Sequence, residues 1–272
     1  MTLIMNHILI RIPAGERGQE LLIGLLSDVA TGFEQQDEQL LAYIEEGSVS
    51  HEELTDLLRE FTYTTEVIGE RNWNAEWEKN FPPVVVGDFV AVRAHFHEPI
   101  AGVRHELLIT PKMSFGTGHH ATTWQVMQQM ENIDFDGKKV FDFGTGTGVL
   151  AILAEKLGAA SVLATDNDPW SMENATENAA RNGCTAIDLR LSSEFPEGER
   201  FDVILANINR NVLLHYCREL AGALEPGGYL LLSGLLVSDR AVIEEAFAKA
   251  GLEAVRYTER NNWISIGLVS KS

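Results

Sequence analysis

The sequence predicts an α/β protein in which a large, mainly parallel sheet has helices on both faces and ends in a terminal β-hairpin, preceded by a small α+β domain. The later part of the chain alternates short apolar runs with helical patterns, as in KVFDFG, SVLATD and FDVILAN. Such alternation is typical of a parallel sheet wrapped by helices. The earlier part has a different order of elements, and 272 residues are enough for two domains.

The first 70 residues predict the order β-α-β-β-α-β. The run HILIRI alternates as a strand does, and ERGQELLIGLLSDVATG places its leucines on one helical face. FEQQDEQLLAYIEE predicts two short strands around a polar centre. Ser50 and Glu53 have capping-box spacing before a second amphipathic helix, and YTTEVIGE is rich in strand-forming residues. This order predicts a ferredoxin-like domain over residues 1–70.

Residues 71–105 are expected to form a connector made of a helix and strand-like pieces. RNWNAEWEKNFPP predicts a helix that stops at a double proline, and VVVGDFVAVRAHF follows with strand character. Residues 106–272 then form the second domain, with five sheet strands at KVFDFG, SVLATD, AIDLRL, FDVILAN and GYLLLSG. The last 21 residues contain two strand-like runs without a helix between them, which predicts the terminal hairpin.

The charge of the chain is unevenly distributed. There are 40 acidic and 21 basic residues, and residues 1–70 contain 14 of the acidic and 3 of the basic ones. An acidic surface repels a phosphate backbone and attracts a basic partner, so we expect no direct reading of nucleic acid. No apolar run approaches the roughly 20 residues of a membrane span. The two cysteines form no disulfide framework, which favours a cytoplasmic location.

The tetrapeptide Phe-Gly-Thr-Gly occurs twice, at Phe115–Gly118 and at Phe143–Gly146. No internal repeat surrounds the two copies, so we expect two loops that contact one ligand. The second loop lies between a strand and a helix, where glycines let a ligand approach the backbone closely. Val149 occupies the position of the third glycine in the G-x-G-x-x-G dinucleotide fingerprint, and no phosphate-binding G-x-x-x-x-G-K motif is present.

An acidic residue ends the next predicted strand. Asp166 follows Gly144 by 22 residues, and a carboxylate there can accept both hydroxyls of a ribose. Asp168 has a structural explanation of its own, because it precedes Pro169 as an N-cap precedes the first residue of a helix. The loop and Asp166 together predict a nucleoside ligand without a pyrophosphate.

These motifs resemble those of a known family. FDFGTGTG resembles the D/E-x-G-x-G-x-G motif of class I S-adenosylmethionine-dependent methyltransferases, carried here by Asp142, Gly144, Gly146 and Gly148. FGTGHHATT is similar to the F-G-T-G-x-H-x-T-T segment of the PrmA-type ribosomal protein L-eleven methyltransferases, as is DVILANI followed by LLSGLL. The resemblance implies a Rossmann-like sheet, S-adenosylmethionine as cofactor, and residues 1–70 as the substrate-recognition domain.

The resemblance also implies roles for particular residues. Gly144 and Gly146 would lie under the methionine part of the cofactor, with Phe115 and Thr123 in a wall over the same molecule. Asp166 would bind the ribose. Asn207 ends FDVILAN at the carboxyl edge of the sheet, where parallel sheets bind ligands. Its side-chain carbonyl can accept an amine N–H while its amide contacts the cofactor, which makes Asn207 the candidate catalytic residue.

The predicted function is methyl transfer to amines of ribosomal protein L-eleven, on lysine side chains, the α-amine or both. Two alternatives remain: the same fold acting on a small molecule, an RNA or another protein, and a non-catalytic S-adenosylmethionine-binding protein. His119 and His120 are adjacent and lack companion ligands, so no metal site is expected. We also expect a monomer. Asn209 and Arg210 depart from the small or apolar residues usual after this strand in the family.

Overall fold

The computed structural model describes residues 7–27, 29–68, 81–110, 116–196 and 198–270. The chain divides into two compact units, Met1–Phe81 and Pro82–Ser272. The helix expected after residue 70 falls on residues 71–80, which lie outside the described ranges.

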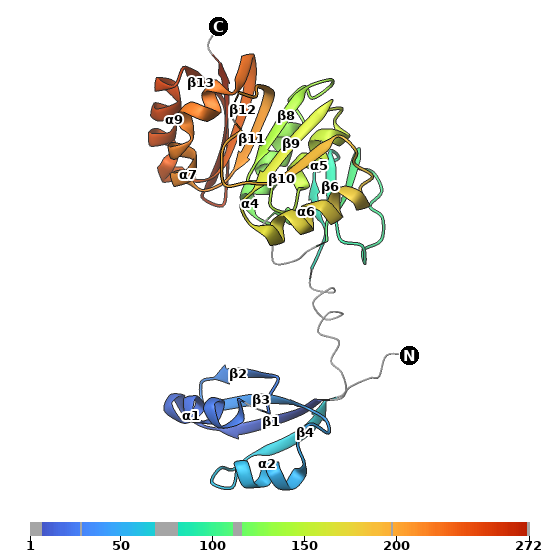
Figure 1. The fold of residues 1–272 in the computed structure, drawn as a ribbon, viewed down its shortest axis with the longest axis vertical. Coiled ribbons are helices and arrows are strands. Elements are labelled where there is room, and N and C mark those ends of the chain that lie inside the picture. Colours follow the sequence, from blue (N-terminus) through green and yellow to red (C-terminus); the bar gives the residue numbers. More distant parts are fainter. Residues whose placement is uncertain (1–6, 28, 69–80, 111–115, 197, 271–272) are drawn as a thin grey trace. The chain divides into compact units, whose positions relative to one another are not determined.

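The first unit is an antiparallel sheet with two helices (Figure 1). Its elements follow the β-α-β-β-α-β order expected from the sequence, and the strands are arranged as β2-β3-β1-β4. The central strands β1 and β3 pair antiparallel over seven residues each. The elements are β1 (His7–Pro13), α1 (Glu16–Leu26), β2 (Gly32–Gln36), β3 (Gln39–Glu45), α2 (His51–Leu57) and β4 (Thr64–Ile68).

Both helices of this unit contribute to one core, because alternate strand residues point to the same face. Leu22 of α1 and Leu54 of α2 pack with Ile10 in this core. The expected capping box starts α2: the Ser50 hydroxyl accepts from the Glu53 amide at 3.2 Å, and the Glu53 carboxylate accepts from the Ser50 amide at 2.9 Å. The second helix therefore begins where the sequence predicted.

The second unit contains a seven-stranded sheet in the order β10-β9-β8-β11-β12-β14-β13. The first five strands are parallel, and β14 runs antiparallel to both of its neighbours. This confirms the predicted Rossmann-like sheet and its terminal hairpin. The elements are β8 (Lys139–Phe143), α5 (Val149–Lys156), β9 (Ser161–Asp166), α6 (Pro169–Arg181), β10 (Ile187–Leu191), β11 (Phe201–Asn207), α7 (Arg210–His215), α8 (Cys217–Gly222), β12 (Leu224–Leu236), α9 (Arg240–Lys249), β13 (Leu252–Arg260) and β14 (Trp263–Ser270).

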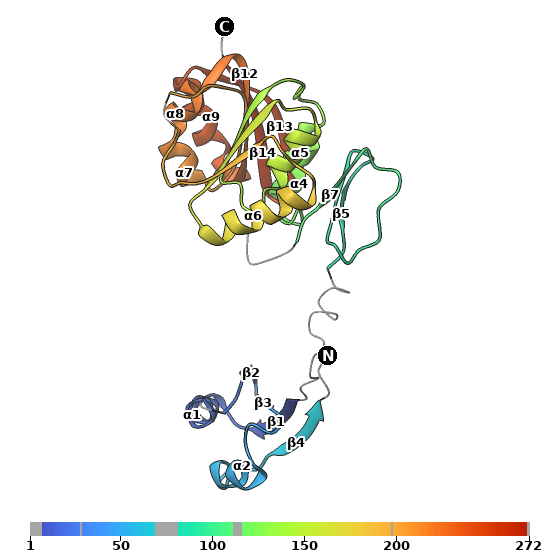
Figure 2. The ribbon, with the colours of Figure 1, turned by 45° about the vertical axis from the view of Figure 1, so that its right-hand side comes forward.

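Helices cover both faces of this sheet (Figure 2). Residues of α4 (Ala121–Met130), α5 and α6 share one core with Val140 and Leu205 of the strands. Residues of α7, α8 and α9 share a second core with Phe141 and Ile204. Neighbouring strand residues thus enter opposite cores, which explains why the parallel strands are apolar along their whole length. No helix in the described ranges is both long and apolar enough to cross a bilayer.

The strand-like pieces expected in the connector belong to the second unit instead. They form a three-stranded sheet of β5 (Val84–Val86), β6 (Val90–Arg93) and β7 (His105–Leu108). Phe89 and Leu107 are buried in the core formed with α4 and α5. Asn182 at the end of α6 bonds both the amide and the carbonyl of Leu108. These strands are too short to bury their apolar side chains alone, so they pack against α4 and α5.

Candidate active site

A cleft of about 640 Å³ lies at the carboxyl ends of the parallel strands in the second unit. The chain runs from β8 outward to β9 and β10 and then returns to β11 on the other side of β8. Ligands of open α/β sheets bind at such a switch point. The cleft brings together five predicted site residues, namely Thr123, Gly144, Gly146, Asp166 and Asn207. The sixth, Phe115, lies outside the described ranges.

The two glycine loops touch each other at the cleft. The Thr147 hydroxyl of the second loop donates to the Gly116 carbonyl of the first at 2.7 Å. Gly116 has a φ of 109°, and a Cβ atom added to it would lie 2.8 Å from the Thr147 hydroxyl. A side chain would therefore separate the loops. The repeated tetrapeptide marks two segments that meet in one site.

The Asp166 carboxylate is oriented by two backbone amides. Gly146 donates to one carboxylate oxygen at 2.8 Å, and Asp168 donates to the other at 3.0 Å. Each oxygen keeps a further lone pair for a ligand hydroxyl. The Asp168 side chain accepts from the amides of Trp170 and Ser171 at the start of α6, which confirms its predicted role as an N-cap.

Asp142 lies buried beneath the second loop, with no exposed surface. One carboxylate oxygen accepts from the Thr145 hydroxyl at 2.6 Å. Burial raises the pKa of Asp142 to about 7; hydrogen bonds from the Thr145 hydroxyl and the Ala151 amide oppose this rise, and the nearby charge of Asp166 adds to it. The loop under the cleft is therefore anchored by a carboxyl group that titrates near neutral pH.

Asn207 ends β11 at the edge of the cleft and contacts another predicted site residue. Its side-chain amide donates to the Thr123 hydroxyl at 3.2 Å. Its carbonyl oxygen Oδ1 is buried and has no hydrogen-bond partner among the described residues. Leaving a buried acceptor unpaired costs about 1–3 kcal/mol, so a ligand N–H that reaches it gains a prepared partner.

Several aromatic residues of the cleft were not predicted as site residues, among them His120 and Trp263. His120 caps α4 through Nδ1, which accepts from the Thr122 amide at 3.3 Å. Its ring lies 4.7 Å from that of Trp263, nearly edge to face. Both residues line the cleft. The sequence indicated His120 as the histidine of the F-G-T-G-x-H-x-T-T segment and as a rejected metal ligand, without a role in the cleft, and Trp263 lies in a hairpin without any motif. Within the described ranges, no three His, Cys, Asp or Glu side chains are grouped to hold a metal.

The two residues that depart from the family pattern have local structural roles. The Asn209 side chain accepts from the amides of Asn211 and Val212, so it caps α7. Arg210 forms an ion pair with Asp239 at 2.9 Å. This pair ties the start of α7 to the segment before α9. The two departing residues therefore stabilise α7, the helix that follows β11.

The sheet order, the glycine loop after β8 and the acidic residue at the end of β9 define a class I S-adenosylmethionine-dependent methyltransferase. The family described as Ribosomal protein L11 methyltransferase (PrmA) matches residues 26–271. The chain belongs to this family, as its motifs predicted.

Two curated relatives and one solved structure carry the name of the same family. The ribosomal protein L11 methyltransferase of Porphyromonas gingivalis is 40% identical over 92% of this chain and 90% of its own. That of Chlorobaculum parvum is 38% identical over 96% and 95%, respectively. A crystal structure of the ribosomal protein L11 methylase of Lactobacillus delbrueckii subsp. bulgaricus matches with a TM-score of 0.66 and 32% identity, over 71% of this chain and all of that one.

S-adenosylmethionine is the cofactor of this class, and the residues present fit it. The cleft has the size of a small-molecule site. Gly144 has a φ of 77° and no room for a Cβ atom beside Ile208, so the loop backbone itself forms the cleft surface. Asp166 offers two oriented acceptors, and Asn207 offers one buried acceptor. These are the groups that a nucleoside joined to an amino acid requires.

Proposed function

We propose that this chain methylates amines of ribosomal protein L11, on lysine side chains, the α-amine or both. The observation that carries the proposal is the buried, unpaired Oδ1 of Asn207, held beside Thr123 in the cleft. An amine nucleophile needs such an acceptor to fix the direction of its lone pair. The family and its relatives supply the identity of the protein substrate.

The cofactor would be held by residues on the β8–β9 side of the cleft. Asp166 would accept the ribose hydroxyls, while Gly144 and Gly146 would let the methionine part lie against the backbone. Phe115 would contact it from the first loop, and Thr123 from the start of α4. When bound, S-adenosylmethionine supplies a methyl group already activated by its sulfonium. The protein therefore has to position the acceptor and exclude water.

Asn207 suits an amine better than a carboxylate would. A lysine amine has a reference pKa near 10.4 and must lose its proton before it attacks. A carboxylate would stabilise the charged ammonium form, whereas a neutral amide orients the amine without doing so. Among the described residues, Asp166 is the only carboxylate that lines the cleft, and backbone amides already hold it. The acceptor side of the cleft thus favours the neutral nucleophile.

We further propose that residues 1–70 bind the protein substrate. Their 14 acidic and 3 basic residues suit a basic ribosomal protein and repel RNA. Recognition by a separate unit raises the concentration of the target amine at the cleft. We expect the enzyme to act as a cytoplasmic monomer that does not read nucleic acid directly.

Incubation with labelled S-adenosylmethionine and large-subunit ribosomal proteins tests the proposal. The label is expected in ribosomal protein L11 and nowhere else. A variant reduced to residues 82–272 is the matched control, since it keeps β5–β7 and every described cleft residue. It should bind the cofactor and lose methylation. Label in RNA or in a small molecule, or full activity of the shortened chain, would contradict the proposal.

A further inference from the structure

A buried polar connection joins α4 to the terminal hairpin. Gln125 donates from Nε2 to the backbone carbonyl of Trp263 at 3.2 Å. Its Oε1 accepts from the Thr258 hydroxyl at 3.0 Å, and Gln129 donates to that hydroxyl at 3.1 Å. Gln125 is 1% exposed and Gln129 is fully buried. Both polar atoms of the Gln125 side chain are paired, whereas Gln129 Oε1 has no hydrogen-bond partner among the described residues, so it is the Gln125 contacts that fix where the hairpin lies on the helix.

Each element in this connection carries a residue of the cleft. The start of α4 holds His120 and Thr123, and Trp263 begins β14. The turn before Trp263 contains Asn261 and Asn262, with φ values of 52° and 64°. Gln125 binds the carbonyl of the first residue after this turn. The hydrogen bond from Gln125 to the Trp263 carbonyl therefore fixes where the Trp263 ring lies relative to His120.

The strand order places Trp263 on the acceptor side of the cleft. Asp166 ends β9, whereas Asn207 ends β11, two strands away. Asn207 is the register partner of Ser233 in β12, and the Ser233 hydroxyl donates to the carbonyl of Ile264 at 3.0 Å. Trp263 is the neighbour of Ile264. A shift of Trp263 thus disturbs the surroundings of Asn207 and leaves the ribose side unchanged.

We propose that Gln125 is a positioning residue for methyl transfer. It holds the turn of the hairpin so that Trp263 stands against His120 and forms the wall along which the acceptor amine enters. This inference rests on the proposed function for its kinetic part only. Gln125 makes two hydrogen bonds, one to the Trp263 carbonyl and one from the Thr258 hydroxyl, which an apolar side chain of equal size could not make.

The chain offers a matched control one turn along the same helix. Gln129 is buried as Gln125 is, and it also bonds Thr258, but it makes no bond to a residue that lines the cleft. Replacement of either glutamine by methionine keeps its length and removes its donor. Gln129→Met removes one hydrogen bond and an unpaired buried oxygen, so it should cost less stability than Gln125→Met, and only Gln125→Met should disturb the cleft.

The test uses the full chain. For Gln125→Met, we expect kcat for ribosomal protein L11 to fall roughly 10- to 100-fold, since misplacement by about 1 Å can cost 10²-fold. Cofactor affinity measured by calorimetry should stay within about twofold. In cofactor-free protein labelled with 5-fluorotryptophan, the ¹⁹F resonance of Trp263, assigned with Trp263→Phe, should shift or broaden. Gln129→Met should leave kcat and this resonance at their wild-type values.

An unchanged Trp263 resonance in Gln125→Met, or equal kcat losses in both variants, would overturn the inference. So would a cofactor affinity that falls in parallel with kcat. If Gln125→Met does not fold, Trp263→Ala must reproduce the loss of kcat with cofactor affinity retained. If wild-type protein fails to methylate ribosomal protein L11, the proposed function is wrong, while the resonance still decides whether Gln125 positions Trp263.

Discussion

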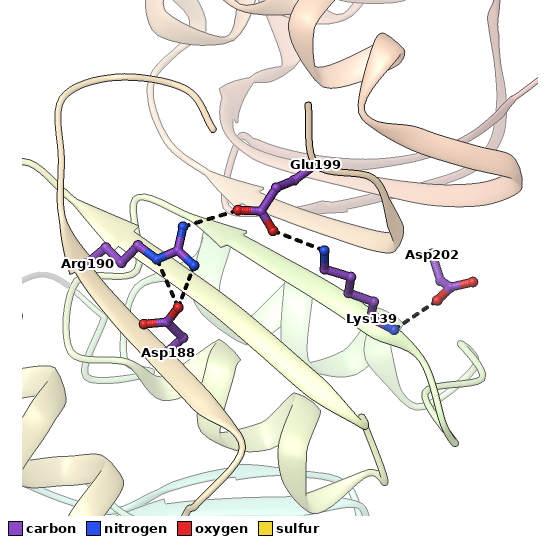
Figure 3. A network of polar contacts seen from close by, with 5 residues as sticks. All are labelled: Lys139, Asp188, Arg190, Glu199 and Asp202. Carbon is purple, nitrogen blue, oxygen red and sulfur yellow. Dashed lines mark hydrogen bonds and ion pairs between the residues drawn. The ribbon is translucent and has the colours of Figure 1, made fainter. Parts of the chain in front are cut away.

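Two polar regions of the second unit differ in whether their polar groups have partners. One is the charged network of Lys139, Asp188, Arg190, Glu199 and Asp202 (Figure 3). Glu199 joins the Lys139 ammonium at 3.0 Å and the Arg190 guanidinium at 3.1 Å. Arg190 also pairs with Asp188, and the Asp202 carboxylate accepts from the Lys139 amide. Each charge has a partner, and the ion-paired side chains are 30–57% exposed.

The cleft is the other region, and there a polar group is buried without a partner. Oδ1 of Asn207 has no hydrogen bond within the described structure. A solvated ion pair contributes little to stability, because water competes for both charges. A buried unpaired acceptor destabilises the free protein and gains a partner when a ligand arrives. The charged network thus has completed polar contacts, whereas Asn207 in the cleft keeps one acceptor that a ligand can pair.

The largest effect is expected for Asn207→Ala, which removes the unpaired acceptor. Turnover should fall by about 10²- to 10³-fold, the scale for loss of one oriented polar group in an active site. Cofactor affinity should fall much less, because orientation of the amine matters mainly in the transition state. Steady-state kinetics and calorimetry measure the two quantities. Equal losses in both would reduce Asn207 to a cofactor contact.

The substitution Asp142→Asn tests whether the buried Asp142 carboxyl makes the stability of the protein depend on pH. The native pKa of about 7 lies above the ordinary value of 3.8, so the native state binds the extra proton between these values. Wild-type stability should therefore fall as pH rises from 5 to 8, by on the order of 2–3 kcal/mol from this group. In Asp142→Asn that part of the pH dependence should vanish. Urea unfolding at several pH values checks this, and identical slopes for the two proteins would contradict it.

Asp166→Ala should weaken cofactor binding by roughly 1.5–3 kcal/mol, the scale of hydrogen bonds to a charged group. Asp168→Ala is the control in the same loop, since Asp168 caps α6 and does not line the cleft. It should lose about 1 kcal/mol of stability and keep its cofactor affinity. If calorimetry gave the opposite ranking, the ribose acceptor would have to be reassigned.

The smallest effect is expected in the charged network. The hydrogen bond from Lys139 lowers the pKa of Glu199. Burial opposes this shift, and the hydrogen bond from Arg190 adds to it. The ionised form then stabilises the native state above the ordinary glutamate pKa, and this contribution is lost as pH falls through the lowered value. Glu199→Gln should cost less than about 1 kcal/mol at pH 7 and nothing in strong acid. A cost above 2 kcal/mol would show that exposed pairs matter more here than we infer.

Local patterns in the sequence were enough to predict many features. The alternation of HILIRI and the capping box at Ser50 depend on neighbours in the chain, and so does the cap at Asp168. The glycine loop, Asp166 and Asn207 were identifiable because each follows directly after an apolar strand. Carboxyl ends of parallel strands meet at one edge, so their approach to a common cleft followed from the fold class.

Only the tertiary structure decided the rest. β5–β7 look like a linker along the chain, and they enter the second unit because their apolar faces need the core of α4 and α5. Trp263 and Gln125 are 138 residues apart and meet because β14 inserts between β12 and β13. Local propensity acts over a few residues, whereas strand insertion depends on burial between distant segments. The wall of the cleft that Trp263 forms therefore results from packing between distant segments, and no sequence motif predicts it.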